Sequence, residues 1–190
     1  PLNVPGEKEF AGRGVSYCAT CDGFFFRDKV VAVVGGGDSA VEESIVLTRW
    51  AKQVYIIHRR DQWRADRTLQ TAAYQNPKIF PIWDTIVTEI HGELTVTELS
   101  LRNVKTGESS RLPVEGVFIF VGSVPNTAFL QGAVALAPYG YIIADREGRT
   151  NVPGVMAAGE AIAGTWAQIV VAAGSGAIAA YAAEQFLAEF

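Results

Sequence analysis

Three continuous apolar runs stand out in the first two thirds of the chain. They cover residues 29–34, 54–57 and 117–121, and only Lys29 interrupts their apolar character. None of them alternates between polar and apolar positions, as a strand with one face in water would. This pattern is typical of strands that are buried on both faces of a parallel sheet.

Helical spacing follows each of the first two runs. Small and apolar positions recur on one face of residues 39–50, with Asp38 or Ser39 available as the N-cap. Residues 64–75 predict a second helix, which ends before Asn76-Pro77. The first two runs and the helix between them form a strand–helix–strand unit, whose crossover should be right-handed.

Alternating positions predict three more strands before the third run, at 83–90, 94–103 and 109–113. Residues 123–126 then read as a linker, because they contain a proline and polar residues between two patterned regions. We therefore expect two domains, 1–124 and 125–190.

The second predicted domain is thin. It offers short strands at 141–144 and 155–158 and one long helix at about 167–186. Two short strands and one helix cannot bury their own apolar surfaces. The segment is expected to be part of a domain.

Composition excludes several classes of function. The chain is 49% hydrophobic and 19% charged, which predicts a folded protein, and its net charge of −4 argues against a nucleic-acid or membrane-surface partner. Residues 161–183 carry no charge and are long enough to span a bilayer. Because glycine and alanine dominate them, we expect a helix buried in a domain.

A glycine-rich motif lies between the first apolar run and the first helix. Gly35–Ala40 reads GGGDSA and matches the G-x-G-x-x-[G/A] pattern in its expected setting. Gly35 permits the tight turn, Gly37 lets a pyrophosphate approach the backbone, and Ala40 lets the helix pack closely on the strand. The motif predicts a dinucleotide site.

The residues after the second run predict which dinucleotide is bound. An NAD site usually has an acidic residue there, but this chain has His58-Arg59-Arg60, with Arg64 one turn further on. Guanidinium groups suit a 2′-phosphate, so NADPH is favoured over NADH. The alternative is a solvated basic face paired with Asp61 and Asp66.

The two cysteines of the chain, Cys18 and Cys21, are separated by two residues. Such a pair in a local helical turn suits dithiol–disulfide exchange, and Asp22 beside it could move the required proton. A zinc site or an inert buried pair are the alternatives; the only histidines, His58 and His91, do not have finger spacing. No metal site is predicted, and the low cysteine count suggests a reducing compartment.

Taken together, these motifs resemble one family. The runs CATCDG at 18–23, GGGDSAVEE at 35–43 and HRRD at 58–61 are similar to the NADPH domain of the low-molecular-weight thioredoxin reductases. The similarity continues through VPNT at 124–127 and TNVPGV at 150–155. The resemblance implies an α/β fold: a three-layer Rossmann-like NADPH-binding domain at 1–124 and, at 125–190, the C-terminal part of an FAD-binding domain.

The resemblance also implies roles for single residues. Cys18 and Cys21 would be the redox-active disulfide, with Cys21 facing the flavin, Cys18 attacking the partner disulfide and Asp22 acting as the acid/base. The expected cofactor-binding residues are Gly35, Gly37, Asp38, Ser39, Ala40, His58, Arg59, Arg60, Arg64, Gly122, Gly159, Glu160, Gln168 and Ile169.

The chain departs from the family pattern in two respects. The N-terminal part of the FAD domain, with its own glycine-rich turn, does not precede residue 1 in this sequence. In the C-terminal part, Glu160 stands where the family usually has Asp, and Ala167 where it usually has Arg. Both departures concern the flavin contacts and not the nicotinamide site.

The resulting hypothesis is a thioredoxin-reductase-like flavoprotein. Electrons would pass from NADPH through FAD to Cys18–Cys21 and on to a thioredoxin-like protein disulfide, in a cytoplasmic homodimer. The 190 residues alone are expected to be inactive. The alternatives are a flavin reductase with another donor or acceptor and a flavin-free NADP-binding regulatory module.

Overall fold

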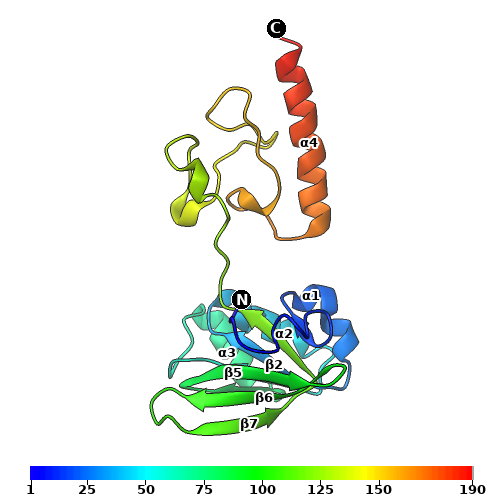
Figure 1. Cartoon of the computed structure of the whole chain (residues 1–190), viewed down its shortest axis with the longest axis vertical. Coiled ribbons are helices and arrows are strands. Elements are labelled where there is room, and N and C mark those ends of the chain that lie inside the picture. The colour runs from blue at the N-terminus through cyan, green and yellow to red at the C-terminus, as the bar shows by residue number, and fades with distance from the viewer. Residues whose placement is uncertain (190) are drawn as a thin grey trace. The chain divides into compact units, whose positions relative to one another are not determined.

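Two compact units make up the chain, Pro1–Val121 and the residues from Gly122 onward. The structure is a computed structural model that describes residues 1–189 (Figure 1).

A five-stranded parallel sheet forms the centre of the first unit, in the order β1-β8-β2-β3-β4. Its strands are β1 (Val15–Ser16), β8 (Gly116–Phe120), β2 (Val30–Gly35), β3 (Gln53–Ile57) and β4 (Ile79–Ile82). The three predicted apolar runs are the three central strands β8, β2 and β3. Their sequences show no alternation because both faces of the sheet are buried.

Helices cover one face of this sheet. They are α1 (Ala19–Asp22), the 3-10 turn η1 (Gly23–Phe26), α2 (Asp38–Leu47) and α3 (Arg67–Gln75). Val31 and Val33 of β2 pack in one core with Val41 of α2.

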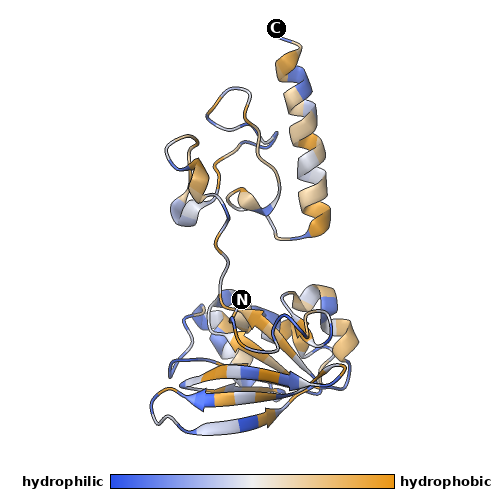
Figure 2. Ribbon diagram, in the orientation of Figure 1, coloured by the Kyte–Doolittle hydropathy of each residue, from blue (hydrophilic) through white to orange (hydrophobic). Residues whose placement is uncertain are grey.

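A second, antiparallel sheet covers the other face. It contains β5 (Thr85–Gly92), β6 (Val96–Asn103) and β7 (Ser109–Pro113). Ala32 and Val34 of β2 pack in a second core with Leu99 of β6. Successive residues of β2 thus serve opposite cores, which makes three layers, as predicted (Figures 1 and 2).

Strand β4 was not predicted. It pairs with β3 at the edge of the sheet, and it contains Pro81. An edge strand tolerates proline because one side of its backbone needs no ladder bonds. The next strand accordingly begins at Thr85 rather than residue 83.

The starts of both helices also differ from the prediction. Gly37 is the N-cap of α2, and Asp38 lies in its first turn. The Asp38 carboxylate accepts a hydrogen bond from the backbone N–H of Asp66, at 2.7 Å. Asp66 itself caps α3, which therefore begins at Arg67 and not at residue 64.

The second unit contains little regular structure before its last helix. It has the 3-10 turns η2 (Ala128–Leu130), η3 (Pro138–Gly140) and η4 (Gly159–Ala161), followed by helix α4 (Ile169–Leu187). The strands predicted at 141–144 and 155–158 were wrong, because Ile142 and Met156 take part only in isolated bridges. Short extended segments do not become strands without neighbours to pair with.

Helix α4 is mostly exposed, contrary to the expectation of a buried helix. Only Ala179 and Ala182 are buried, whereas Ile169 is 90% and Val170 is 77% exposed. Figure 2 shows apolar colour along its length. By length and composition alone, the helix could cross a membrane, and only 11% of its apolar stretch is buried.

Candidate functional site

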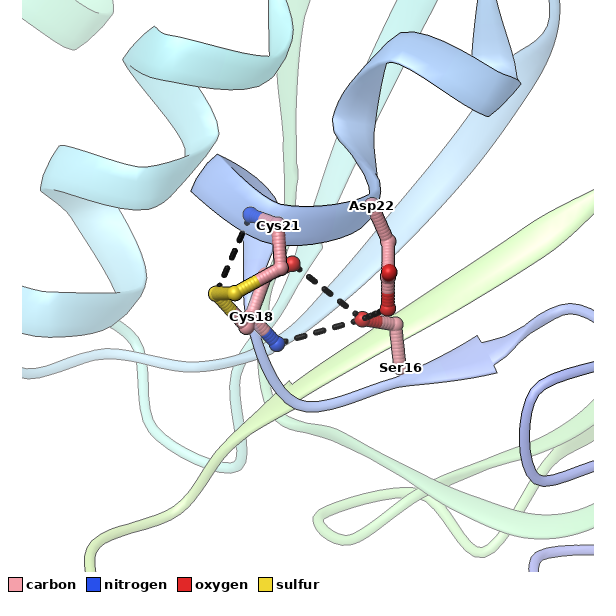
Figure 3. The surroundings of a disulfide bond; sticks show 4 residues. All are labelled: Ser16, Cys18, Cys21 and Asp22. Atoms are coloured by element: carbon pink, nitrogen blue, oxygen red, sulfur yellow. Dashed lines mark hydrogen bonds between the residues drawn. A yellow bond between two sulfur atoms is a disulfide. The ribbon is translucent and has the colours of Figure 1, made fainter. Parts of the chain in front are cut away.

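A disulfide joins Cys18 and Cys21 at the two ends of one short helical turn. Cys18 is the N-cap of α1, and its sulfur accepts a hydrogen bond from the backbone N–H of Cys21 at 3.1 Å (Figure 3). Cys21 is exposed and Cys18 is half-buried. The pairing of the two cysteines and the local helical turn were both predicted from the sequence.

Asp22 is held in place by a side chain that the sequence analysis missed. The buried hydroxyl of Ser16 lies 2.7 Å from Asp22 Oδ2 and 3.1 Å from the backbone nitrogen of Cys18, which donates to it (Figure 3). The sequence contains one weak signal for this role, a polar residue in the apolar setting of β1. The group formed by Ser16, Asp22 and the disulfide is called the disulfide cluster below.

Glu43 of α2 contacts the same turn from the other side. Its carboxylate accepts hydrogen bonds from the backbone N–H groups of Thr20 and Ala19, which precede the first hydrogen bond within α1. Burial raises the pKa of Glu43, and its Oε2 atom is buried without a hydrogen-bond partner among the described residues. Glu43 therefore connects the helix of the glycine motif with the turn of the disulfide.

The glycine motif forms a close turn with one open position. Gly35 has φ +154°, and a side chain there would collide with the carbonyl of Phe120 and with Ala40. A methyl group added to Gly37, in contrast, would meet no atom within 4 Å among the described residues other than its chain neighbours. This is the geometry predicted for Gly35, Gly37 and Ala40, and it leaves room for a ligand at Gly37.

The N-terminus of α2 faces the same turn. Its first intrahelical hydrogen bond runs from Val41 N to Gly37 O, so the N–H groups of Asp38, Ser39 and Ala40 come before it. Asp38 and Ser39 are exposed, and Ala40 is fully buried. Backbone N–H groups and the helix dipole at such a position attract phosphate.

His58 lies directly beneath the glycine turn. A side chain at Gly36 would collide with the His58 imidazole, which is only 6% exposed. Burial lowers the pKa of His58 first, and the positive charges of Arg64, Arg60 and Arg59 lower it further. A neutral imidazole is thus packed under the turn, with three guanidinium groups close enough to influence it.

The three arginines predicted to bind the 2′-phosphate are exposed and have no ion-pair partner among residues 1–189. The two carboxylates that could have neutralised them are engaged elsewhere. Asp61 pairs with Lys105 at 3.2 Å, and Asp66 accepts the N–H of Thr68 as the cap of α3.

Backbone bonds hold this arginine segment against the glycine turn. The N–H of Arg64 donates to Gly36 O at 2.7 Å, and the N–H of Asp84 donates to Arg60 O at 3.1 Å. Lys105 reaches from the loop after β6 to Asp61 and, at 3.0 Å, to Asp84. The uncompensated positive charge therefore lies beside the open position at Gly37.

Most residues predicted to contact the cofactors in the second unit lie on the 3-10 turn η4 and at the start of α4. Gly159 donates its N–H to Ser175 of α4 at 2.9 Å, and Gln168 is the N-cap of that helix. Glu160 and Ile169 are exposed, as is Gly122 with φ +95°. Their contacts with a cofactor stay a prediction.

An open pocket of about 390 Å³ lies in the second unit, between α4 and the segment before it. It is lined by residues that include Asp145, Arg146, Ile162, Trp166 and Ser175. None of Gly122, Gly159, Glu160, Gln168 and Ile169 lines this pocket. Sequence analysis did not single out the residues that do, because they carry no recognisable motif.

Comparison with known proteins links these features to one family. The family model for pyridine nucleotide-disulphide oxidoreductases matches residues 1–176. The chain is 50% identical to the thioredoxin reductase of Streptomyces coelicolor over 188 residues, which are 98% of this chain and 58% of that protein. It is 46% identical to the thioredoxin reductase of Treponema pallidum over 98% of this chain and 60% of that protein.

A solved structure agrees with this comparison. The crystal structure of thioredoxin reductase from Streptococcus pyogenes superposes with a TM-score of 0.95 at 46% identity, covering 100% of this chain and 62% of the other. The expected Rossmann-like α/β fold is thereby confirmed. The chain spans about three fifths of the length of these relatives.

Proposed function

The chain belongs to the pyridine nucleotide-disulphide oxidoreductase family, and from this premise we propose that it is the NADPH-binding and disulfide-bearing part of a thioredoxin reductase. The observation that carries the proposal is the set of three unpaired arginines beside an open glycine turn, in the same unit as the Cys18–Cys21 disulfide. Nucleotide recognition and disulfide chemistry are thus combined within residues 1–121.

The residues present fit NADPH. The open position at Gly37 and the first N–H groups of α2 suit the pyrophosphate, and Arg59, Arg60 and Arg64 suit the 2′-phosphate. A different electron donor, without such a phosphate, would leave three guanidinium groups with no counterpart. We therefore favour NADPH over the other donors that the sequence left open.

The disulfide cluster supports an exchange reaction. In this family's chemistry NADPH supplies the electron pair as a hydride, and FAD passes the pair on to a disulfide. Cys18 receives the N–H of Cys21 at its sulfur, a bond that would stabilise a thiolate there, so we assign Cys18 as the residue that attacks the partner disulfide. Asp22 would hold or release the proton, and Cys21 would face the flavin.

The proposed flavin site is incomplete in these 190 residues. Helix α4 exposes most of its apolar surface, and the relatives are longer than this chain by about two fifths of their own length. We propose that the rest of an FAD domain covers α4, with Gly159, Glu160, Gln168 and Ile169 on the flavin side. In this proposal the complete protein is a cytoplasmic homodimer that reduces a thioredoxin-like protein.

Counting thiols in the complete protein tests the proposal. After anaerobic addition of NADPH and denaturation in a thiol-reactive dye, we expect two more thiols per chain than in the untreated protein. The Cys18→Ser/Cys21→Ser double variant should show no increase while still binding NADPH. An unmodified protein that binds flavin and NADPH but gains no thiols would contradict the proposed function.

A further inference from the structure

A buried hydroxyl in the disulfide cluster has no role in the function proposed so far. Ser16 is 4% exposed and sits on β1, where it pairs with the fully buried Phe118 of β8. Its neighbour Val15 is 2% exposed. Burying a hydroxyl in such apolar surroundings costs free energy unless the hydroxyl is hydrogen-bonded. The hydrogen bonds of Ser16 therefore indicate its role.

Those bonds connect the two ends of the disulfide turn. The N–H of Cys18 donates to Ser16 Oγ at 3.1 Å, and Ser16 Oγ lies 2.7 Å from Asp22 Oδ2 and 3.3 Å from the carbonyl of Cys18. A hydroxyl has one proton to donate, and an anionic carboxylate at the shorter distance is the stronger acceptor. The Ser16 hydroxyl therefore donates its hydrogen bond to Asp22 Oδ2, which is marked by a dashed line in Figure 3.

This arrangement fixes the Asp22 carboxylate relative to the sulfur atoms. Ser16 belongs to a strand of the sheet, whereas Cys18 and Asp22 belong to a short turn that lies outside it. A turn of four residues does not by itself define where the carboxylate points. The hydroxyl anchors that carboxylate to the sheet.

We propose that Ser16 is a positioning residue for disulfide exchange, which acts by orienting the Asp22 carboxyl group. The proposal rests on the proposed function, because it needs Cys18–Cys21 to be redox-active. When a dithiol reduces this disulfide, the two sulfur atoms of the dithiol become oxidised to a disulfide and the Cys18–Cys21 bond breaks. The Asp22 carboxyl group gives a proton to one of the two cysteine thiolates released and takes a proton back from solvent.

Loss of the hydroxyl should slow this reaction. Without Ser16 the Asp22 carboxyl group loses its hydrogen bond to β1 and is less well oriented toward the sulfur atoms. A hydrogen bond to a charged group corresponds to about tenfold or more in rate.

The experiment measures reduction of the 190-residue chain by dithiothreitol between pH 5 and 9, with thiols quenched and counted at each time. Ser16→Ala should be about tenfold slower than the wild type. The matched control is Ser44→Ala, because Ser44 is also a fully buried hydroxyl and donates to the carbonyl of Ala40 at 2.6 Å, within α2. The control should keep the wild-type profile.

A second pair of variants separates the effect of the missing hydroxyl from an effect of impaired folding. Ser16→Thr and Ser16→Val have nearly the same shape and differ by the hydroxyl, so the threonine variant should stay close to wild type and the valine variant should behave like alanine. In the Asp22→Asn background, Ser16→Ala should cause no further loss, because the two residues act as one unit.

Two results would overturn the inference alone. One is a reducible disulfide whose rate of reduction is the same in the serine, alanine and valine forms. The other is an effect of Ser16→Ala that persists undiminished in Asp22→Asn, which would mean a purely structural role. A wild-type disulfide that resists dithiothreitol altogether would instead overturn the proposed function and this inference with it.

Discussion

The two units of the chain bury their apolar side chains to very different degrees. In the first unit, side chains as large as Phe118, Leu47 and Ile56 have no exposed surface, and each face of the sheet has its own covering layer. In the second unit, the cluster of buried residues is Val134, Ile142 and Ala157, beside a helix of 19 residues. We call the first unit complete because both faces of its sheet are covered, and the second incomplete because most of α4 is exposed.

This difference separates binding from turnover. All residues proposed for NADPH and for the disulfide cluster belong to the complete unit, except Gly122 at its border, whereas those proposed for the flavin belong to the incomplete one. The chain should therefore bind nucleotide and undergo disulfide exchange without performing the overall reaction.

The 190 residues alone should give no NADPH-driven reduction of a thioredoxin. A nicotinamide cofactor transfers a hydride, so an intermediary such as flavin is needed before a disulfide can be reduced. The measurement is a visible spectrum and a turnover assay, with and without an added N-terminal FAD segment. A stoichiometric flavin spectrum together with turnover from the chain alone would show that the second unit is complete after all.

Removal of one of the unpaired arginines should weaken NADPH binding by more than about tenfold, because each contact with a phosphate is charge-assisted. Binding of NADH by Arg60→Ala should stay nearly unchanged. The matched control is Arg111→Ala, whose guanidinium pairs with Glu98 at 2.8 Å on the antiparallel sheet. Equal losses for both nucleotides, or an equal loss in the control, would argue against a 2′-phosphate site.

A charge on the exposed face of α4 should reduce self-association of the chain several-fold, because a contiguous apolar surface promotes it. Ile169→Glu, at a residue that is 90% exposed, is the test variant in sedimentation experiments over a range of concentrations. Leu94→Glu is the control, since Leu94 is 79% exposed on the first unit. If both substitutions act alike, the open surface of the second unit has no special role.

The smallest effect concerns His58 and pH. Its pKa lies below the ordinary value in the folded chain, so between that pKa and about 6.5 the unfolded chain binds more protons. The free energy of unfolding should therefore fall as the pH drops through 6.5 toward the folded value. Glu43, whose pKa is raised, acts with the opposite sign above its ordinary value.

Comparison of variants isolates the contribution of His58. Denaturant titrations at a series of pH values should show a steeper loss of stability toward acid in the wild type than in His58→Gln. NADPH should reduce this difference, because a phosphate beside the imidazole favours its protonated form. Parallel pH curves for the two proteins would contradict the placement of a neutral imidazole under the glycine turn.

How far sequence alone could predict this molecule depended on how local each signal was. The central strands β2, β3 and β8 were recognisable because burial on both faces leaves a continuous apolar run. Strand β4 was missed, since it is four residues long, contains Pro81 and exposes Phe80. The strands predicted in the second unit lack the partners that would make them strands.

The same distinction applies to the sites. The glycine turn, the arginines and the cysteine pair are each contiguous or nearly so in sequence. Their spacing alone was enough to predict a nucleotide site and a redox-active pair. Ser16 lies outside these motifs and reaches Asp22 from a strand of the sheet. Glu43 ends the run at 35–43, but nothing in that run indicates that it reaches Ala19 of a different helix. Only the packing of three elements around the disulfide identifies them.

The most direct test of the central claim is the ratio of two dissociation constants. Calorimetric titration of the 190-residue chain with NADPH and with NADH, in the same buffer, asks whether this chain contains a nucleotide site that selects for the 2′-phosphate. The account predicts that NADPH binds at least about tenfold more tightly than NADH, by the value of one charge-assisted phosphate contact. Equal affinities, or no binding of either nucleotide by the folded chain, would contradict it.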